Sequence, residues 1–304
     1  MYDLIIIGAG PAGLSAAVYG CRAGLDCLLL EESTYGGQVT STSEIENYPS
    51  VKKIAGWELA DNLYQQAIGF GATLNFEKVL SIINDGNLKT VITDQNAYVT
   101  KAVIIANGAK RRKLGVEGEN EFSGRGVSYC ANCDGSFFKD KTAVVIGGGN
   151  TALEDALYLS NICSKVYLVH RRNEYRAEKY LVDSVMKNDK IVPLLSRTPV
   201  RINGTGSVES IILNNIETAE EETINTDAVF VCIGLLPDNS AFGETVNLDK
   251  NGYIVAGEDC VTSSAGIFAA GDTRTKLLRQ IVTAASDGAI AANAAVTYIN
   301  NLEE

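Results

Sequence analysis

Several residue types are scarce in this chain of 304 residues, and each scarcity removes a class of function. Histidine occurs once, at position 170, which nearly excludes histidine catalysis elsewhere in the chain. No apolar stretch approaches the ~18 residues of a membrane-spanning helix. The apolar run at residues 4–7 enters a glycine turn directly and has no basic leader before it, so we expect a soluble cytoplasmic protein that binds no membrane.

Cysteine and positive charge are also in short supply. Seven cysteines are too few for a disulfide scaffold, and their odd number argues against a fully paired secreted protein, so we expect a reducing compartment. The net charge of −11 disfavours a general affinity for nucleic acid. Basic residues nevertheless gather twice, at 110–113 and at 170–176, although such runs are ordinarily solvated surface.

The chain contains one unit twice, because residues 3–32 and residues 142–171 align without a gap. Each copy runs from a β-branched apolar stretch through a glycine turn into an Ala/Leu-rich helix and a second strand, which is the βαβ unit of a doubly wound sheet. In such a turn, small residues allow the tight bend, the approach of a pyrophosphate and the seating of the helix on the strand. The two turns therefore predict two dinucleotide sites. Their predicted contact residues are Gly8, Gly10, Pro11, Ala12 and Gly13 in the first copy, and Gly147, Gly149, Asn150 and Thr151 in the second.

The two copies differ at the end of their second strand. The first copy has Glu31 and Glu32 there, and a carboxylate can accept hydrogen bonds from an adenosine ribose, as in FAD or NAD, whereas the second copy has His170 and Arg171. With Arg172 and Arg176 close behind, this end suits the 2′-phosphate of NADPH, because guanidinium groups bind phosphate and a carboxylate repels it. A solvated helix start is the alternative interpretation of the arginines. Beside them, His170 is better suited to contact a ligand phosphate than to act as a general base.

The segments around the repeats predict an α/β protein with two Rossmann-like, three-layer domains, one inserted into the other. Residues 1–111 and 240–304 form one discontinuous domain, and residues 112–239 form the inserted domain. In the last segment an apolar strand ends near Asp272, which can bind the sugar-alcohol hydroxyls of a cofactor or serve as an ordinary turn residue.

The stretch "YCANCDG" at 129–135 places Cys130 and Cys133 two residues apart. A zinc site needs about four ligands and no second pair accompanies this one, so we expect no metal. A structural bridge around so small a loop constrains the unfolded chain little, which favours a redox-active pair. Asp134 can serve as the acid and base of this pair or simply form the Asp-Gly turn, and the sequence leaves both roles open. The other cysteines fall on apolar patterns and are expected to be buried: Cys21, Cys27, Cys163, Cys232 and Cys260.

The predicted cofactors and the cysteine pair can be ordered as carriers of electrons. NADPH delivers two electrons as a hydride and a dithiol carries two as paired thiols, but hydride does not pass efficiently from nicotinamide to sulfur. A flavin between them can accept the hydride and reduce the disulfide. Two nucleotide sites and one CxxC match that order of carriers.

On these motifs the chain resembles the low-molecular-weight, bacterial type of thioredoxin reductase over nearly its full length. The resemblance rests on "IIIGAGPAG", "YGGQ", "CANCDG", "GGGNTALEDALYLS", "HRRNEYR", "GIFAAGD" and "RQ", and above all on a CxxC-Asp just before the second glycine motif. It implies FAD in the outer segments, NADPH in the middle domain, a homodimer, and thioredoxin as protein substrate. It also implies that the NADPH domain swings, presenting nicotinamide and disulfide to the flavin in turn.

The same resemblance implies roles for single residues. Cys133 would be the sulfur beside the flavin, Cys130 would attack the thioredoxin disulfide, and Asp134 would be the acid and base. Asn107 replaces a common threonine, and we expect FAD binding to survive this change. Further positions would line FAD or close over it: Gly36, Gly37, Gln38, Asn47, Gly108, Asp272, Arg279 and Gln280.

Related flavin proteins are the alternatives. A ferredoxin-driven reductase would keep the CxxC but lack the glycine and arginine features of the second site, and a ferredoxin–NADP reductase would lack the CxxC. The peroxiredoxin-reducing flavoprotein has an additional N-terminal thioredoxin-like domain, which we do not expect because the first motif begins at residue 5. A non-catalytic redox sensor is the alternative of another class, and catalytic turnover distinguishes it.

Overall fold

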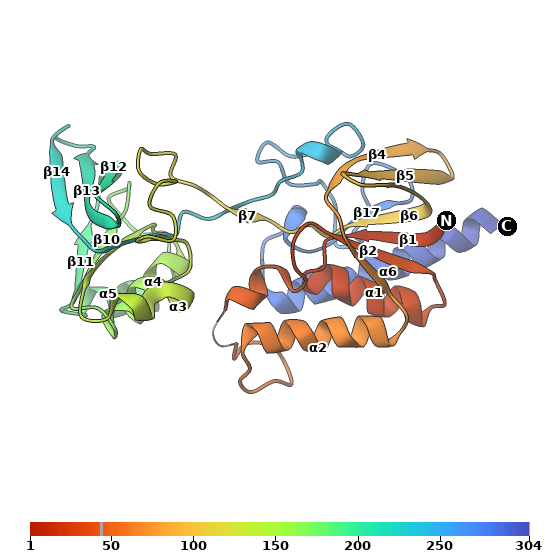
Figure 1. Ribbon diagram of the computed structural model, residues 1–304, viewed down its shortest axis with the longest axis horizontal. Coiled ribbons are helices and arrows are strands. Elements are labelled where there is room, and N and C mark those ends of the chain that lie inside the picture. Colours follow the sequence, from red (N-terminus) through yellow and green to blue (C-terminus); the bar gives the residue numbers. More distant parts are fainter. Residues whose placement is uncertain (43–44, 304) are drawn as a thin grey trace. The chain divides into compact units, whose positions relative to one another are not determined.

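The computed structural model describes residues 1–42 and 45–303, without the side chains of residues 41, 132, 133, 235 and 303. The chain divides into two compact units (Figure 1). Met1–Lys110 and Leu236–Glu304 form the outer unit, and Arg111–Leu235 form the middle unit. Each unit contains parallel strands with helices, so the predicted α/β class is confirmed.

The sheet of the outer unit has the order β3-β2-β1-β6-β5-β4, and β17 also pairs with β6. Its strands are β1 Tyr2–Ile7, β2 Cys27–Glu31, β3 Thr73–Phe76, β4 Val79–Asp85, β5 Leu88–Thr93, β6 Ala97–Ile105 and β17 Ile267–Ala269. The first half of β6 pairs antiparallel with β5, whereas its last three residues pair parallel with β17. At the carboxyl edge the sheet therefore presents five parallel strands in the order β3-β2-β1-β6-β17.

Both faces of this sheet are covered. Along β1, Leu4 and Ile6 pack with the helices on one face, whereas Ile5 and Ile7 pack on the other with the β4–β5 hairpin and with apolar side chains such as Phe242. Such burial on both faces explains the unbroken apolar run of the strand. The helices are α1 Pro11–Arg22, α2 Gly56–Gly69 and α6 Ile281–Glu303, and Figure 1 shows α1 and α6 side by side. Short 3₁₀ turns complete the unit: η1 Gly37–Ser41, η3 Ser240–Phe242 and η4 Gly271–Thr273.

The middle unit repeats this plan with a fully parallel sheet in the order β11-β10-β9-β15-β8. Its strands are β8 Val127–Ser128, β9 Thr142–Ile146, β10 Lys165–Val169, β11 Ile191–Leu194 and β15 Ala228–Val231. The helical elements are α3 Ala131–Asp134, η2 Gly135–Phe138, α4 Asn150–Ser160 and α5 Lys179–Met186. An antiparallel sheet of β12 Arg197–Gly204, β13 Val208–Asn215 and β14 Glu221–Asn225 contributes apolar side chains to the opposite face of the parallel sheet.

The chain crosses between the units twice, and the two crossings pair as the short strands β7 Lys110–Arg111 and β16 Leu235–Leu236. The middle unit ends at Leu235, whereas the sequence predicts residue 239. The reason is that Asp238 and Asn239 already bond within the outer unit. The ammonium group of Lys110 lies 3.1 Å from the Asp238 carboxylate, and Asn239 accepts a hydrogen bond from the Thr273 hydroxyl at 2.8 Å.

Among the residues that the structure describes, no helix combines the length and the apolar character that a membrane span requires.

Two glycines let helices of the outer unit approach backbone closely. A Cβ atom on Gly13 of α1 would lie 1.8 Å from the carbonyl oxygen of Gly8, and one on Gly288 of α6 would lie 2.1 Å from the carbonyl oxygen of Ala12. Neither neighbour is a flexible side chain, so neither can yield easily. Gly288 therefore sets the spacing between α6 and the first turn of α1.

We predict that Gly288→Ala lowers the free energy of unfolding by about 1–3 kcal/mol, because the added methyl group overpacks a backbone contact. Gly69→Ala is the matched control, since a Cβ atom at Gly69 of α2 meets nothing within 4 Å. That substitution should raise the free energy of unfolding by about 0.5–1 kcal/mol through helix propensity. Chemical denaturation measures both, and equal effects of the two substitutions would contradict the prediction.

Candidate functional site

The first glycine turn links β1 to α1. Gly8 has a φ of +101°, and a Cβ atom there would lie 2.4 Å from the carbonyl oxygen of Ala106, so only glycine fits. Helix α1 begins at Pro11 and has no side-chain cap, which leaves the amide groups of its first turn open to an anion. A Cβ atom on Gly37 would lie 3.3 Å from the Cα atom of Gly10, so these two predicted residues face one another.

Glu31 ends β2 beside this turn. One of its carboxylate oxygens accepts a hydrogen bond from the Ala9 amide at 2.9 Å, and the other accepts one from the Ser33 amide at 3.1 Å. The amide of Gly36 donates to the Ala9 carbonyl oxygen at 2.7 Å, so the predicted "YGGQ" loop is tied to the same turn. The structure thus brings together the predicted glycines, Glu31 and the loop.

Asp272 lies in η4, just after β17, and its Oδ1 atom is buried with no hydrogen-bond partner among the described residues. Burial raises the pKa of this carboxyl group, against the opposing charges of Lys276 and Arg279. The Oδ1 atom of Asn107, after β6, is likewise buried and without a partner in the described structure. Unsatisfied buried acceptors are costly, and a ligand that offers hydroxyl or N–H donors would satisfy them. This turn therefore fits a cofactor with a sugar-alcohol chain.

The remaining predicted residues of the outer unit take part in three sets of side-chain contacts. The guanidinium group of Arg279 lies 4.1 Å from the centre of the Tyr253 ring, and its Nε atom lies 3.5 Å from the Asp272 carbonyl oxygen. Asn47 donates to the side chain of Gln280 at 3.0 Å, across more than two hundred residues of sequence. The side chain of Gln38 donates to the backbone of Ala109, which follows Gly108.

The second glycine turn links β9 to α4. A Cβ atom on Gly147 would lie 2.3 Å from the carbonyl oxygen of Cys232, and Gly149 precedes α4 without a side-chain cap. Asn150 and Glu178 bond reciprocally: the Asn150 side chain donates to the Glu178 carboxylate at 3.0 Å and accepts from its amide at 2.9 Å. Thr151 is exposed in the first turn of α4.

His170 follows β10, but its ring is buried and not exposed beside the arginines. A Cβ atom on Gly148 would lie 2.3 Å from the imidazole, so this glycine, which the sequence analysis missed, makes room for the ring. The Nε2 atom of His170 has no hydrogen-bond partner among the described residues. Burial, and then the charges of the following arginines, lower the pKa of His170. The three exposed arginines of this segment are Arg171, Arg172 and Arg176.

Cys130 lies just after β8 and is disulfide-bonded. The side chain of Cys133, its predicted partner, lies outside the described residues. Ser128, buried at the end of β8, donates to the Asp134 carboxylate at 2.6 Å and accepts from the Cys130 amide at 3.1 Å. Ser128 therefore links the first cysteine to the predicted acid, a role that the sequence analysis missed. The free cysteines of the described structure are Cys21, Cys27, Cys163, Cys232 and Cys260. Three of them are buried as predicted, whereas Cys21 and Cys232 are only partly buried.

Cys232 is more than an apolar filler. Its thiol donates to the Asp155 carboxylate at 3.0 Å, directly behind the second glycine turn. Burial, followed by the neighbouring carboxylate, raises the pKa of Cys232 well above its ordinary value, so this thiol stays protonated. The backbone of Cys232 also contacts Gly147 of the second glycine turn, and this thiol is distinct from the predicted redox pair at 130 and 133.

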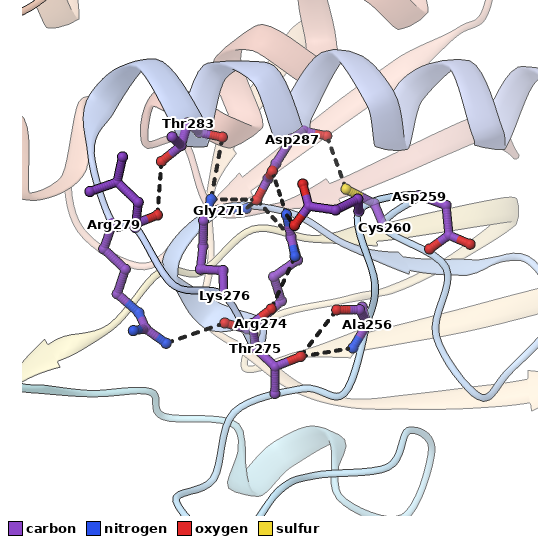
Figure 2. A network of polar contacts seen from close by, with 12 residues as sticks. Ala256, Asp259, Cys260, Gly271, Arg274, Thr275, Lys276, Arg279, Thr283 and Asp287 are labelled. Atoms are coloured by element: carbon purple, nitrogen blue, oxygen red, sulfur yellow. Dashed lines mark hydrogen bonds and ion pairs between the residues drawn. The ribbon is translucent and has the colours of Figure 1, made fainter.

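A further cluster, not predicted from the sequence, joins α6 to Gly271 and the residues that follow it (Figure 2). Its centre is Asp287 of α6, which bonds to Gly271, Arg274 and Lys276. One signal was available: Asp287 is the only charged residue between positions 281 and 302. A lone carboxylate in an Ala-rich helix indicates a buried partner of opposite charge.

Both sets of residues gather at the carboxyl ends of parallel strands, where ligands of open α/β sheets bind. In the outer unit, Glu31 follows β2, the glycine turn follows β1, and Asp272 follows β17. In the middle unit, the arginines follow β10, the second glycine turn follows β9, and Cys130 follows β8. In the outer unit, β6 lies between β1 and β17. In the middle unit, β15 lies between β9 and β8 in the same way.

The comparisons with known proteins agree with this geometry. A family model described as pyridine nucleotide-disulphide oxidoreductase matches residues 2–288. The chain belongs to this family. Within the family, it is 44% identical to the thioredoxin reductase of Treponema pallidum over 303 residues, which cover 99% of this chain and 98% of that protein.

Two further relatives of the family are similar over the full length. The thioredoxin reductase of Bacillus subtilis is 44% identical over 305 residues, covering 100% of this chain and 96% of its own. The crystal structure of Lactococcus lactis thioredoxin reductase gives a TM-score of 0.92 at 39% identity, covering 99% of this chain and 100% of that one. The predicted resemblance to bacterial thioredoxin reductases and the predicted Rossmann-like fold class are confirmed.

The only histidine of the chain allows a direct test of the electrostatics at the end of β10. We predict that His170 titrates below its ordinary value of 6.5, because burial and three nearby arginines oppose its charged form. The unfolded chain then binds the additional proton, so stability declines as the pH falls from 6.5 toward the folded pKa. Arg171→Gln should raise the pKa, and Arg125→Gln, elsewhere in the middle unit, should leave it unchanged. Proton NMR resolves this single imidazole, and a folded pKa at or above 6.5 would contradict the assignment.

Proposed function

We propose that this oxidoreductase uses NADPH and FAD to reduce the disulfide of thioredoxin. The observation that carries the proposal is the disulfide-bonded Cys130 at the same sheet edge as the second glycine turn. Its full-length similarity to proteins named thioredoxin reductase supports thioredoxin as the substrate. A homodimer remains a proposal from the family resemblance alone.

The outer unit is the proposed FAD site. The open amides at the start of α1 would bind the pyrophosphate, and Glu31 would accept hydrogen bonds from the adenosine ribose. Asp272 would accept hydrogen bonds from the ribityl hydroxyls, which would satisfy its buried Oδ1 atom. When bound, FAD supplies the chemistry that takes a hydride from NADPH and returns two electrons to a disulfide.

The middle unit is the proposed NADPH site. Its arginines at 171, 172 and 176 are exposed, and none has an ion pair among the described residues, so they are available to a 2′-phosphate. A dinucleotide with its pyrophosphate at the turn after β9 and its phosphorylated ribose after β10 would extend its other half toward β15 and β8. That direction leads to Cys130.

The dithiol half of the reaction follows from the residues around Cys130. The thiolate of Cys130 would attack one sulfur of thioredoxin's disulfide, forming a mixed disulfide and releasing the other sulfur as a thiolate. Cys133 would then attack Cys130, which frees the second thioredoxin sulfur and restores the disulfide of the chain. Asp134, held by Ser128, would supply and remove the protons of these thiols. One NADPH and one proton thus yield NADP⁺ and one thioredoxin dithiol.

Two alternatives differ from this proposal in donor or in turnover. Reduced ferredoxin as donor is disfavoured, because the second glycine turn and the arginines would then lack a ligand. A redox sensor would accept electrons from NADPH without turning over.

A swing of the middle unit between half-reactions is compatible with the two short crossings at Lys110–Arg111 and Leu235–Leu236.

An anaerobic titration tests the proposed function. We predict that two equivalents of NADPH, one for the disulfide and one for the flavin, bleach the yellow holoprotein and that oxidised thioredoxin restores its colour. Cys133→Ser should still be bleached by NADPH but should reduce no thioredoxin, whereas Cys21→Ser should behave as the wild type. Retained turnover in Cys133→Ser would refute the assigned role. Bleaching without turnover of thioredoxin or of a disulfide dye would establish the sensor, and bleaching by reduced ferredoxin alone would establish the other donor.

A second prediction concerns the choice of nucleotide. Arg171→Ala should weaken transition-state binding with NADPH by about 1.5–3 kcal/mol, the value of a hydrogen bond to a charged group. Activity with NADH should change little, because NADH has no 2′-phosphate. The ratio of kcat/KM values for the two nucleotides measures this effect, with Arg125→Ala as the control. Equal losses with NADPH and NADH would contradict the 2′-phosphate assignment.

A further inference from the structure

A buried ionic cluster connects α6 with the segment 271–276 and is built around one carboxylate, that of Asp287 (Figure 2). Asp287 is 3% exposed. Its Oδ2 atom accepts hydrogen bonds from the Gly271 amide at 2.9 Å, from Nε of Arg274 at 2.8 Å and from Nζ of Lys276 at 2.8 Å. Its Oδ1 atom accepts a further bond from the Arg274 guanidinium at 2.8 Å. One side chain of α6 therefore fixes three residues of the segment 271–276.

The charges of the cluster make this arrangement hard to change. The side chains of Arg274 and Lys276 are 1% and 4% exposed, so two cations share one buried anion. Burial alone would raise the pKa of Asp287, but the bonds from Arg274, Lys276 and Gly271 outweigh burial and leave the pKa below its ordinary value. The carboxylate thus stays ionised near neutral pH. Breaking such a network would leave a buried charge without its partner.

The segment that Asp287 holds includes Asp272, whose Oδ1 atom is buried and without a partner in the described structure. Gly271 has a φ of +79°, and a Cβ atom there would lie 2.8 Å from the Cβ atom of Ala12 in the first turn of α1. The η4 turn is therefore clamped between α1 on one side and Asp287 on the other. Gly288, next to Asp287, packs on the carbonyl oxygen of Ala12. Helix α6 therefore contacts the first turn of α1 through Gly288 and the η4 turn through Asp287.

We propose that Asp287, together with Arg274, is a positioning residue for FAD, holding the η4 turn so that Asp272 presents its open oxygen to the ribityl chain. This inference rests on the proposed FAD site of the outer unit. It goes further by assigning the placement of Asp272 to an ionic cluster that does not itself touch the cofactor. The cluster acts through the backbone of Gly271 and the residues that follow it.

The order of the strands gives this role a specific consequence. A pyrophosphate bound at the turn after β1 would direct the adenosine half toward β2 and Glu31, because β2 neighbours β1 on that side. The ribityl and isoalloxazine half would then extend toward β6 and β17, where Asp272 is placed. Asp287 should therefore matter for the flavin half and not for the adenosine half. ADP, which contains only the adenosine half, separates the two.

The test compares the dissociation constants of FAD and ADP for the full-length apoprotein, measured by calorimetry. Asp287→Asn should raise the Kd of FAD by about tenfold or more, the loss of roughly one charge-assisted bond, and change the Kd of ADP by less than about twofold. A similar rise for both ligands would show a general loosening of the unit and would overturn the proposal. Unchanged binding of both ligands would overturn it as well.

Asp287→Asn leaves two buried cations without their buried anion, since only the exposed Glu258 still pairs with Arg274, so a milder variant accompanies it. Arg274→Lys keeps the positive charge but removes the bidentate fork that orients Asp287. It should raise the Kd of FAD in the wild-type background, yet add less than about twofold when Asp272 is already alanine. Additive effects in the double variant would show that the cluster does not act through Asp272, which overturns the proposal even if Asp287→Asn does not fold.

The wild-type apoprotein separates this inference from the proposed function. Binding of FAD by the wild type, with no discrimination between FAD and ADP in the variants, would reject only the role of Asp287. Failure of the wild type to bind FAD would instead reject the proposed FAD site itself.

Discussion

The outer unit depends on one close backbone contact, in which Gly13 of α1 packs against the carbonyl oxygen of Gly8 at the end of β1. A side chain at Gly13 would collide with the carbonyl oxygen of Gly8, so the helix starts directly over the carboxyl edge of the sheet. Its free amides then converge with residues that follow β2 and β17. Helix α6 extends this arrangement, because Gly288 packs on Ala12 while Asp287 holds the η4 turn. Without these close approaches, Glu31 and Asp272 would not be held at the same edge of the sheet as the start of α1.

Much of this was predictable from the sequence, because the features are local. The spacing of small residues in the two repeats follows from the geometry of a strand–turn–helix, and the structure has both turns with helices beginning at Pro11 and Asn150. Strand ends are also local, so the positions of Glu31 and Asp272 at the carboxyl edge followed from the apolar runs before them. The resemblance to bacterial thioredoxin reductases was readable from the same motifs.

What the sequence did not reveal depends on contacts between distant segments. The bonds of Asp287 to Gly271 and Arg274 cross from a helix to a turn, and no periodicity encodes them. The packing of the His170 ring against Gly148 was likewise not visible in the sequence. Cys232 looked like an apolar filler, yet its thiol bonds to Asp155. In each case the partner, and not the residue itself, decides the environment.

The pairing of β7 with β16 brings the start and the end of the middle unit next to each other. A module whose two ends are adjacent can be placed inside another protein at the cost of closing only a short loop. Since both units share one architecture and aligned glycine turns, the chain has the form expected of a duplicated gene in which one copy was inserted into a surface connection of the other. Such an origin would give two ancestral nucleotide-binding folds a permanent 1:1 ratio, while leaving each free to diverge in the ligand it accepts.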